Sequence, residues 1–413
     1  MGVENNIPEG WVETTLGEIS KVQTGPFGSQ LKNEQYITGG TPVITVEHIK
    51  DFRISDFDYP SVTNEDRDRL SKYLLKEGDI VFTRVGSVDL SAYVSKKQDG
   101  WMFSSRMLNV RPTNQVDSKY ISYFFRQPLF RSYIFRISVG ATMPSINTGI
   151  LKSIPISYPP LPEQKAIAKI LTAFDNKIEL LQAQNKTLET MAQTIFKEWF
   201  GKYQIGDELP DGWRVGKLDE VLSICGGTTP STKNPDFWGG KINWTSPKDL
   251  SNSKGLFLLN TEKKITKEGL NKISSGLLPK GTLLLSSRAP VGYLSITHIE
   301  LAINQGYIAL LPQQYLSNNY MYLWLDKYMQ VVKNAANGST FLEISKTAFR
   351  NIECVIPLQD ILEKFDQIIE PIFSKVLYNT IQIQSLTKTR DTLLPKLMSG
   401  QVRVNNIKQT ANA

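Results

Sequence analysis

Side chains that can bind a nucleic acid gather at matched places in the two halves of this chain. Arginine and lysine neutralise phosphates, while hydroxyl, amide and guanidinium groups read the edges of base pairs. Two glycine-rich loops, 25–32 (GPFGSQLK) and 226–238 (GGTTPSTKNPDFW), carry hydroxyl groups and a lysine, and further candidates lie where expected strands run into loops. We predict two surfaces for double-stranded DNA, with the candidates Ser29, Gln30, Lys32, Arg84, Ser87, Ser105 and Arg106 in the first half, and Thr229, Ser231, Lys233, Ser287, Arg288, Asn304 and Gln305 in the second.

Each of these residues also has a simpler interpretation, as an ordinary solvated loop side chain or as a cap on a backbone group. Residues 120–136 (YISYFFRQPLFRSYIFR) interleave aromatic residues with arginines. We interpret the aromatic residues as the core face of a helix packed on a sheet, and Arg126, Arg131 and Arg136 as candidate phosphate contacts.

The sequence contains none of the catalytic motifs that we sought. It has no GxxxxGK[ST], HExxH or GxSxG, and no GxGxxG after an expected strand. Asp249, Glu262 and Lys264 have the residue types that a nuclease needs, but a solvated charge run explains them more simply. Two histidines and two cysteines, Cys225 and Cys354, without a CxxC pair predict neither a disulfide framework nor a metal site. We therefore predict a non-catalytic chain with no metal and no cofactor of its own.

The chain repeats itself. Residues 8–25 (PEGWVETTLGEISKVQTG) match residues 210–227 (PDGWRVGKLDEVLSICGG) at a shift of 202, and residues 140–159 match residues 338–357 at a shift of 198. Between these anchors the halves differ, as in EGDIVFTRVGSVDLSAYV and KGTLLLSSRAPVGYLSIT. A shared framework with unlike contents predicts one scaffold that carries two recognition surfaces.

Each copy ends in an expected long helix. Residues 161–200 contain no glycine, and their apolar residues recur at alternating spacings of four and three, which is the heptad pattern of a coiled coil. The pattern returns 198 residues later, where we expect Pro371 to cause a kink or a late helix start. A helix of about 38 residues is roughly 55 Å long, so the two can bury their apolar seams only against each other or against partners. The predicted seam comprises Ile167, Leu171, Phe174, Ile178, Leu181, Asn185, Leu188, Val376, Asn379, Ile383, Leu386 and Leu393.

These patterns predict an α+β fold. We expect two similar α/β globules separated by two long helices that form an antiparallel coiled coil, with the halves related by a pseudo-twofold repeat. The expected segments are a first recognition domain (1–160), a first helical spacer (161–204), a second recognition domain (205–357), a second helical spacer (358–404) and a tail (405–413).

Charge and hydropathy restrict the partners and the compartment. The net charge of +7 favours a polyanionic partner. The sequence has no apolar run long enough for a membrane helix and no secretory signal pattern at residues 1–10, so we expect a cytoplasmic chain with no membrane partner.

Five sequence features together resemble one known family, the specificity subunit of type I restriction–modification systems. The resemblance spans nearly the whole chain. The second copy departs from it at Leu358-Gln359-Asp360, where the first copy has Pro-Glu-Gln. The features are the PEGW and PDGW openings, TGPFGSQL (24–31), LPEQKAIAKILTAFDNKIELL (161–181), AINQGYIALLP (302–312) and LLPKLMSGQVRV (393–404).

The resemblance implies a division of labour among several chains. Each globule would read one half of a bipartite sequence in double-stranded DNA. The helices would set the gap between the half-sites and dock two methyltransferase subunits, and restriction subunits would complete the assembly. S-adenosylmethionine, ATP and Mg²⁺ would then belong to the partner subunits.

Two alternative functions remain open from the sequence. One is a coiled-coil protein-interaction scaffold without DNA recognition, and the other is an enzyme such as a nuclease or a methyltransferase fragment. Steeply salt-dependent DNA binding would exclude the first. Activity of the purified chain alone would support the second.

Overall fold

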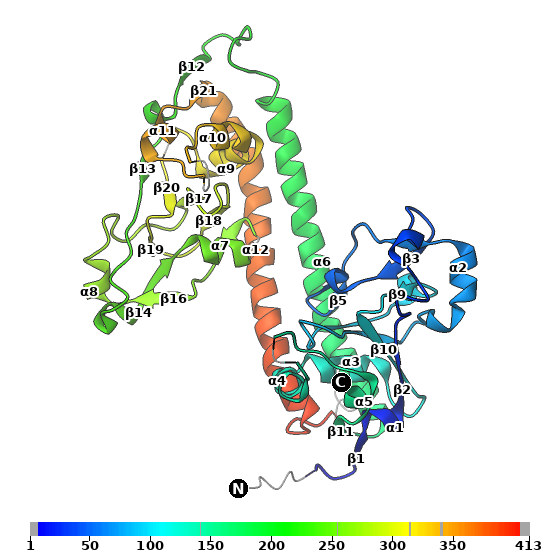
Figure 1. The fold of residues 1–413 in the computed structure, drawn as a ribbon. Helices are drawn as coiled ribbons and strands as arrows, with labels where there is room; N and C mark the ends of the chain where they lie inside the picture. The colour runs from blue at the N-terminus through cyan, green and yellow to red at the C-terminus, as the bar shows by residue number, and fades with distance from the viewer. Residues whose placement is uncertain (1–6, 141, 254, 314, 339–341, 405–413) are drawn as a thin grey trace, which may run out of the picture. The chain divides into compact units, whose positions relative to one another are not determined.

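The computed structural model describes residues 7–140, 142–253, 255–313, 315–338 and 342–404, so the tail expected at 405–413 lies outside the described residues. The chain divides into two compact units. Unit 1 comprises Met1–Asn176 and Thr387–Ala413, and unit 2 comprises Lys177–Leu386. Each unit therefore contains one globule and one stretch of each long helix (Figure 1).

The globule of unit 1 has a central antiparallel sheet in the order β2 (Ser20–Thr24), β10 (Met107–Pro112), β7 (Ile80–Thr83), β8 (Ser91–Tyr93). A smaller sheet has the order β6 (Ser61–Val62), β3 (Thr41–Ile44), β9 (Met102–Phe103), with β3 and β9 parallel. β1 (Val12–Thr15) pairs with β11 (Pro155–Tyr158), and β4 (Ile49–Lys50) pairs with β5 (Arg53–Ile54). The helices of this globule are α1 (Leu16–Ile19), α2 (Asn64–Arg69), α3 (Ser118–Arg126), α4 (Pro128–Ile137) and α5 (Thr148–Lys152).

The globule of unit 2 repeats this topology. Its central sheet has the order β13 (Ile224–Cys225), β20 (Tyr307–Leu310), β17 (Leu283–Ser286), β18 (Leu294–Thr297), β15 (Phe257–Leu258). The smaller sheet has the order β16 (Lys263–Ile265), β14 (Trp238–Thr245), β19 (Leu301–Ile303), again with a parallel pair, and β12 (Arg214–Lys217) pairs with β21 (Glu353–Ile356). Its helices are α7 (Pro247–Ser253), α8 (Lys267–Leu270), α9 (Asn318–Lys327), α10 (Met329–Asn334) and α11 (Lys346–Arg350). The predicted internal repeat and the α+β class are confirmed.

The two long helices are α6 (Leu161–Trp199) and α12 (Gln359–Met398). Within unit 2, α6 and α12 run antiparallel, since Asn185 bonds Asn379 while Phe196, further along α6, lies against Phe365, earlier on α12. Within unit 1, Asp175 of α6 contacts Arg390 of α12. α12 begins at Gln359, so the late start expected at Pro371 is wrong, and the helix continues through the proline.

The repeated Pro-x-Gly-Trp opening is a tight turn that closes each globule onto the end of a long helix. The Trp11 N–H donates to the Pro8 carbonyl and the Trp213 N–H to the Pro210 carbonyl, both at 3.0 Å. Trp213 packs on the rings of Phe200 and Tyr203, just beyond the end of α6. Near the end of α12, Gly400 has φ +72°, and a Cβ there would lie 2.6 Å from the Pro8 ring, so only glycine fits.

Both globules extend their apolar cores onto the long helices. In unit 1 one buried cluster joins sheet residues such as Phe82 to Leu171 of α6 and Leu397 of α12. In unit 2 the corresponding cluster joins Leu283 to Phe196 of α6 and Phe365 of α12. Burial of apolar area stabilises a fold by about 25 cal/mol per Å², so this packing stabilises each unit.

A second, smaller core in unit 1 contains a buried histidine. The ring of His48 stacks on Tyr59 with centroids 4.4 Å apart, and its Nδ1 accepts a hydrogen bond from the Thr45 N–H at 3.0 Å. Burial lowers the pKa of His48, although the nearby Glu47 carboxylate and backbone hydrogen bonds act in the opposite direction.

We predict that unit 1 loses stability as the pH falls below about 6.5. Below this pH the unfolded chain protonates His48, whereas the folded chain protonates it only at a lower pH. The free energy of unfolding therefore decreases as the pH falls. In His48→Asn the amide oxygen can still accept from Thr45, and this pH dependence should disappear. The pH dependence of this stability is measured in both proteins by hydrogen exchange of the β3 and β6 amides between pH 5 and 7.5, corrected for intrinsic rates. An identical pH dependence in variant and wild type would contradict the assignment.

Candidate nucleic-acid interface

The candidates of the first half meet at one end of the central sheet of unit 1. β2 ends at Thr24, β7 ends at Thr83 and β10 begins at Met107, so three connections emerge at this edge. The Arg84 N–H donates to the Arg106 carbonyl at 2.9 Å, and the Gly25 N–H donates to the Met107 carbonyl at 3.1 Å. The sheet therefore brings the loop 25–32 beside Ser105 and Arg106.

Glycine is required where this loop leaves the sheet. A Cβ on Gly25 would lie 2.1 Å from the Ser104 carbonyl oxygen. In unit 2 a Cβ on Gly227 would lie 1.8 Å from the Ile303 carbonyl oxygen. The same close approach of two backbone segments therefore fixes the start of both loops and explains why the sequence repeats glycine at this point.

The candidates of the second half occupy the equivalent edge. The Ser287 N–H donates to the Gly306 carbonyl at 2.8 Å, and the Thr229 hydroxyl donates to Gln305 Oε1 at 2.7 Å. Arg288 forms an ion pair with Glu343 at 3.7 Å. The loop 226–238 thus lies beside Asn304 and Gln305.

Backbone contacts show which candidate positions correspond in the two units. The Ile146 N–H donates to the Arg84 carbonyl, and the Ile344 N–H donates to the Ser287 carbonyl, both at 2.9 Å. The counterpart of Arg84 is therefore Ser287, and Arg288 corresponds to Val85. The two edges share a backbone but present different side chains.

Exposure separates the candidates. Eight are exposed and could contact a ligand directly, and five are half-buried. Ser287 is only 3% exposed, so the structure does not present its side chain to a ligand. The exposed residues are Ser29, Lys32, Ser87, Arg106, Thr229, Ser231, Lys233 and Gln305, and the half-buried ones are Gln30, Arg84, Ser105, Arg288 and Asn304.

Two of the arginines proposed as phosphate contacts have other partners. Arg126 is 14% exposed and forms an ion pair with Asp175, and Arg131 forms an ion pair with Asp89. Their charges are compensated within the protein, so a role as phosphate contacts stays a prediction for both. Arg136 is exposed and lies over the Tyr133 ring.

Sequence reasoning missed a basic groove in unit 2. A shallow groove is lined by Thr232, Trp238, Glu262, Lys263 and Lys264, between β14 and β16. Lys263 Nζ lies 5.4 Å from the centre of the Trp238 ring. Lysines beside a half-buried aromatic ring suit a nucleic-acid strand. The adjacent lysines in the sequence were the signal for this groove.

The acidic residues considered for a nuclease have structural roles. The Asp249 carboxylate accepts from the N–H groups of Ser246 and Glu262, and Lys248 pairs with Glu262. Over the residues that the structure describes, no group of three or more histidine, cysteine or acidic side chains could hold a metal ion. Burial raises the pKa of the Cys354 thiol to about 12, which keeps it protonated at neutral pH.

The predicted helical seam is largely enclosed. Seven of its residues are buried and five are half-buried. The two seam asparagines bond each other within unit 2, with Asn379 Nδ2 donating to Asn185 Oδ1 at 2.9 Å and Asn185 Nδ2 donating to the Thr380 hydroxyl at 3.2 Å. The buried residues are Ile167, Leu171, Ile178, Leu181, Asn185, Val376 and Asn379, and the half-buried ones are Phe174, Leu188, Ile383, Leu386 and Leu393.

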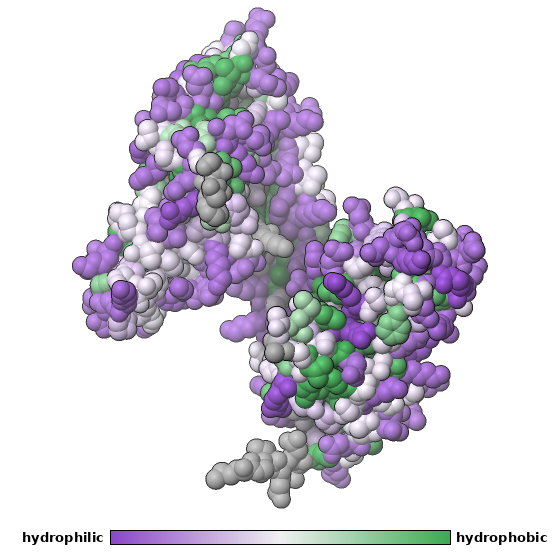
Figure 2. Space-filling view, in the orientation of Figure 1, coloured by the Kyte–Doolittle hydropathy of each residue, from purple (hydrophilic) through white to green (hydrophobic). Residues whose placement is uncertain are grey.

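No helix among the described residues is long and apolar enough to cross a membrane. On the face drawn in Figure 2, hydrophilic side chains cover most of both globules, and apolar side chains gather on unit 1 in the region of α4. The exposed apolar residues on and beside this helix are Leu129, Phe135 and Val139.

Comparison with known proteins identifies the family. Residues 8–190 and 210–390 each match the family described as the type I restriction modification DNA specificity domain. The chain is 26% identical to the MjaIX specificity subunit of Methanocaldococcus jannaschii, over 97% of this chain and 95% of that one. It is 24% identical to the HindI specificity subunit of Haemophilus influenzae, over 95% and 99% respectively.

A solved structure agrees on the fold. The type I restriction–modification S subunit of M. genitalium superposes with a TM-score of 0.61 at 18% identity, over 96% of this chain and 98% of that one. The chain therefore belongs to the family of type I restriction–modification DNA specificity domains, of which it carries two copies. Members of this family are non-catalytic specificity subunits.

We predict that the seam asparagines are energetically coupled. Asn185→Leu or Asn379→Leu alone leaves a buried amide without its partner and should lower the free energy of unfolding by about 1–3 kcal/mol. The double leucine variant should cost much less than the sum of the two, because both amides are removed together. Urea unfolding of the four proteins measures the coupling, with Gln367→Leu on the exposed face of α12 as the control. Additive single effects would contradict the pairing.

We predict that Arg106 contributes a phosphate contact. Among the described residues Arg106 is exposed and has no acidic partner. Arg106→Ala should weaken binding to duplex DNA roughly three- to tenfold at low salt and flatten the salt dependence by about 0.9 in slope, the value of one phosphate contact. The control is Arg67→Ala on α2, which removes a half-buried arginine paired with Asp68. Salt titrations of the complex by fluorescence anisotropy distinguish the two, and equal slopes would contradict this role.

Proposed function

We propose that this chain is the DNA sequence-specificity subunit of a type I restriction–modification complex. Each globule reads one half of a bipartite target, and the helices set the unread gap between the halves. The observation that carries this proposal is that the same backbone arrangement occurs twice with different residues, such as the exposed Arg106 in unit 1 and Gly306 at the equivalent position in unit 2. Two readers on one scaffold would recognise two different sequences.

The geometry of the helices suits a spacer. α6 has 39 residues and α12 has 40, so each is roughly 60 Å long at 1.5 Å per residue. Major-groove sites on one face of B-DNA recur about every 34 Å. Helices of this length therefore suffice to hold two readers about one helical turn apart.

The catalytic steps belong to other chains in this proposal. Two methyltransferase subunits would dock on the helices and use S-adenosylmethionine to methylate adenine at N6. Restriction subunits would use ATP and Mg²⁺ for translocation and cleavage. Exposed apolar side chains on the long helices support protein partners there: Leu180 and Met191 on α6, and Ile368, Tyr378 and Ile381 on α12. A complex that acts on chromosomal or incoming DNA would work in the cytoplasm.

The scaffold alternative makes a different prediction about DNA. The same exposed helix residues would serve a protein-interaction scaffold without DNA recognition. Such a scaffold would bind DNA weakly and would leave no sequence-specific methylation. The basic groove of unit 2 and the exposed Arg106 favour the DNA-reading function.

The test is an exchange of one reader. Residues 212–357 are replaced by the equivalent segment of another family member, and the hybrid is expressed with the methyltransferase partner of this chain. Single-molecule sequencing of N6-methyladenine should show that one half-site changes while the other half and the gap stay the same. The control is the chain with its own residues 212–357, expressed with the same methyltransferase partner. A change in both halves would contradict independent readers, and the absence of any sequence-specific methylation would contradict the function itself.

A further inference from the structure

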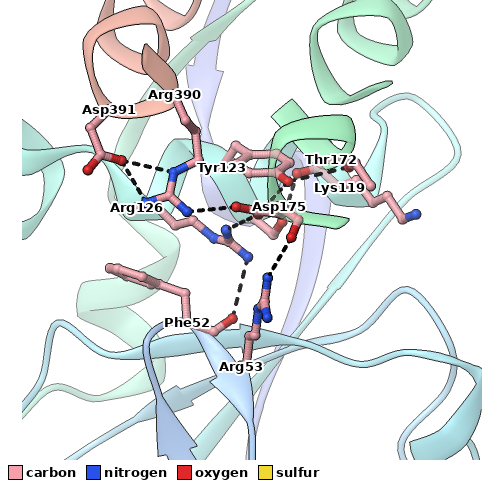
Figure 3. Close-up of polar contacts among 10 residues, drawn as sticks. Phe52, Arg53, Lys119, Tyr123, Arg126, Thr172, Asp175, Arg390 and Asp391 are labelled. Atoms are coloured by element: carbon pink, nitrogen blue, oxygen red, sulfur yellow. Dashed lines mark hydrogen bonds and ion pairs between the residues drawn. The ribbon is translucent and has the colours of Figure 1, made fainter. Parts of the chain in front are cut away.

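Asp175 on α6 is the centre of a buried ion-pair cluster in unit 1 (Figure 3). Its side chain is 8% exposed. Oδ2 accepts hydrogen bonds from Arg126 Nη1 at 2.6 Å and from the Tyr123 hydroxyl at 2.7 Å, and Oδ1 accepts from Arg390 Nη1 at 2.7 Å. Arg53 Nη2 donates to the Asp175 carbonyl at 3.2 Å. One residue therefore links α6 to α3, to α12 and to the β4–β5 hairpin.

The hairpin that supplies Arg53 has a strained turn. Lys50 pairs with Arg53, so the turn consists of Asp51 and Phe52, with φ of +49° and +61°. Turns of this kind favour Asn-Gly, because residues with a Cβ avoid the left-handed region. The Phe52 carbonyl accepts from Arg126 Nη2 at 3.4 Å, and the Arg126 guanidinium lies 5.5 Å from the centre of the Phe52 ring. The contact with Arg126 therefore holds a strained hairpin in place against the cluster (Figure 3).

The carboxylate of Asp175 stays charged in this setting. Burial by itself raises the pKa of Asp175, but the Arg126 charge, the Tyr123 hydrogen bond and Arg390 outweigh it, and the net pKa lies below the usual value. Arg126 and Arg390 are 14% and 23% exposed. Removal of the carboxylate charge would leave the largely buried Arg126 guanidinium without a counter-ion and Arg390 with Asp391 alone. A buried charge that loses its partner is strongly destabilising.

The matching positions on the long helices of unit 2 carry apolar side chains. The shift of 198 between the two helices places Phe373 at the position of Asp175 and Ala192 at the position of Arg390. Phe373 is 2% exposed and its ring contacts Phe257 and Tyr322, at centroid distances of 6.4 and 5.9 Å. Apolar packing is non-directional, whereas charge-assisted hydrogen bonds fix an angle. The first globule is thus fixed on its helices by directional bonds at a position where the second relies on apolar packing.

We propose that Asp175 is a positioning residue for the first recognition domain: through α3, α12 and the hairpin it fixes that domain on its helix segments, and so determines how many base pairs remain unread between the half-sites. This inference rests on the proposed function. The candidate base-reading residues, such as Arg84 and Arg106, lie at the sheet edge and not in the cluster. Asp175 therefore acts through the placement of the domain, and its loss should alter the gap and not the sequence of either half-site.

The first test maps methylation. Asp175→Asn keeps the size of the side chain and removes its charge. In cells that carry the variant and the methyltransferase partner, the methylated fraction of sites with the wild-type gap should fall at least tenfold. Methylated sites with gaps one base pair longer or shorter should appear, with both half-site sequences unchanged. The control is Asp360→Asn, which alters an exposed pair with Lys364 on α12 and should stay within twofold of wild type. An unchanged fraction and gap in Asp175→Asn would overturn the proposal.

The second test does not depend on DNA. Hydrogen exchange of the purified full chain should show amides of residues 49–54 and 118–126 exchanging at least tenfold faster in Asp175→Asn, while the central strands β7 and β10 exchange as in wild type. Equal exchange at 49–54 and 118–126 would overturn the role of Asp175 whatever the methylation map shows. A wild-type chain that directs no bipartite methylation would overturn the proposed function alone, and the exchange result would still decide the role of Asp175 in holding the domain.

Discussion

Each globule buries its largest apolar surface on segments of both long helices, and the other features of the structure depend on that packing. A sheet with an apolar face is stable only when another element covers that face. In unit 1 the cover includes Leu171 and Leu397, and in unit 2 it includes Phe196 and Phe365. The long helices are therefore part of both cores and not simple linkers, so a change in helix packing is transmitted directly to the domain that lies on it.

Polar groups buried in this apolar packing define its geometry. The Asn185–Asn379 pair lies in the seam of unit 2, where hydrophobic contacts alone would allow several alignments. A buried polar pair is satisfied in only one register, which restricts the helices to one alignment at some cost in stability. The Asp175 cluster plays the comparable part in unit 1, between the helices and the first globule.

The surfaces that vary are kept outside the cores. In unit 1 the candidate ligand-binding side chains lie where β2 and β7 end and β10 begins, and in unit 2 they lie at the matching ends of β13, β17 and β20. Backbone hydrogen bonds that any residue except proline can form support both places. Gly25 and Gly227 are the exceptions, because a Cβ would collide with the neighbouring strand connection. A scaffold of this kind accepts different loop side chains without loss of its packing.

Several features were determined by the sequence alone. The repeat, the α+β class and the two long helices follow from matched motifs and from heptad spacing, because these patterns depend on local periodicity and on residues close together in the chain. The family followed from the same motifs. The sequence also placed most candidate residues beside the ends of strands, since a strand followed by a polar loop is a local signal.

Only the tertiary structure decided which side chains are free to bind a ligand. Ser287 is buried, and Arg126 and Arg131 are held by Asp175 and Asp89, which are distant in the sequence. The sequence likewise did not predict that Asn185 pairs with Asn379, although it assigned both residues to the seam. Burial and ion pairing depend on residues brought together from distant parts of the chain, and a linear pattern contains no information about which of them meet.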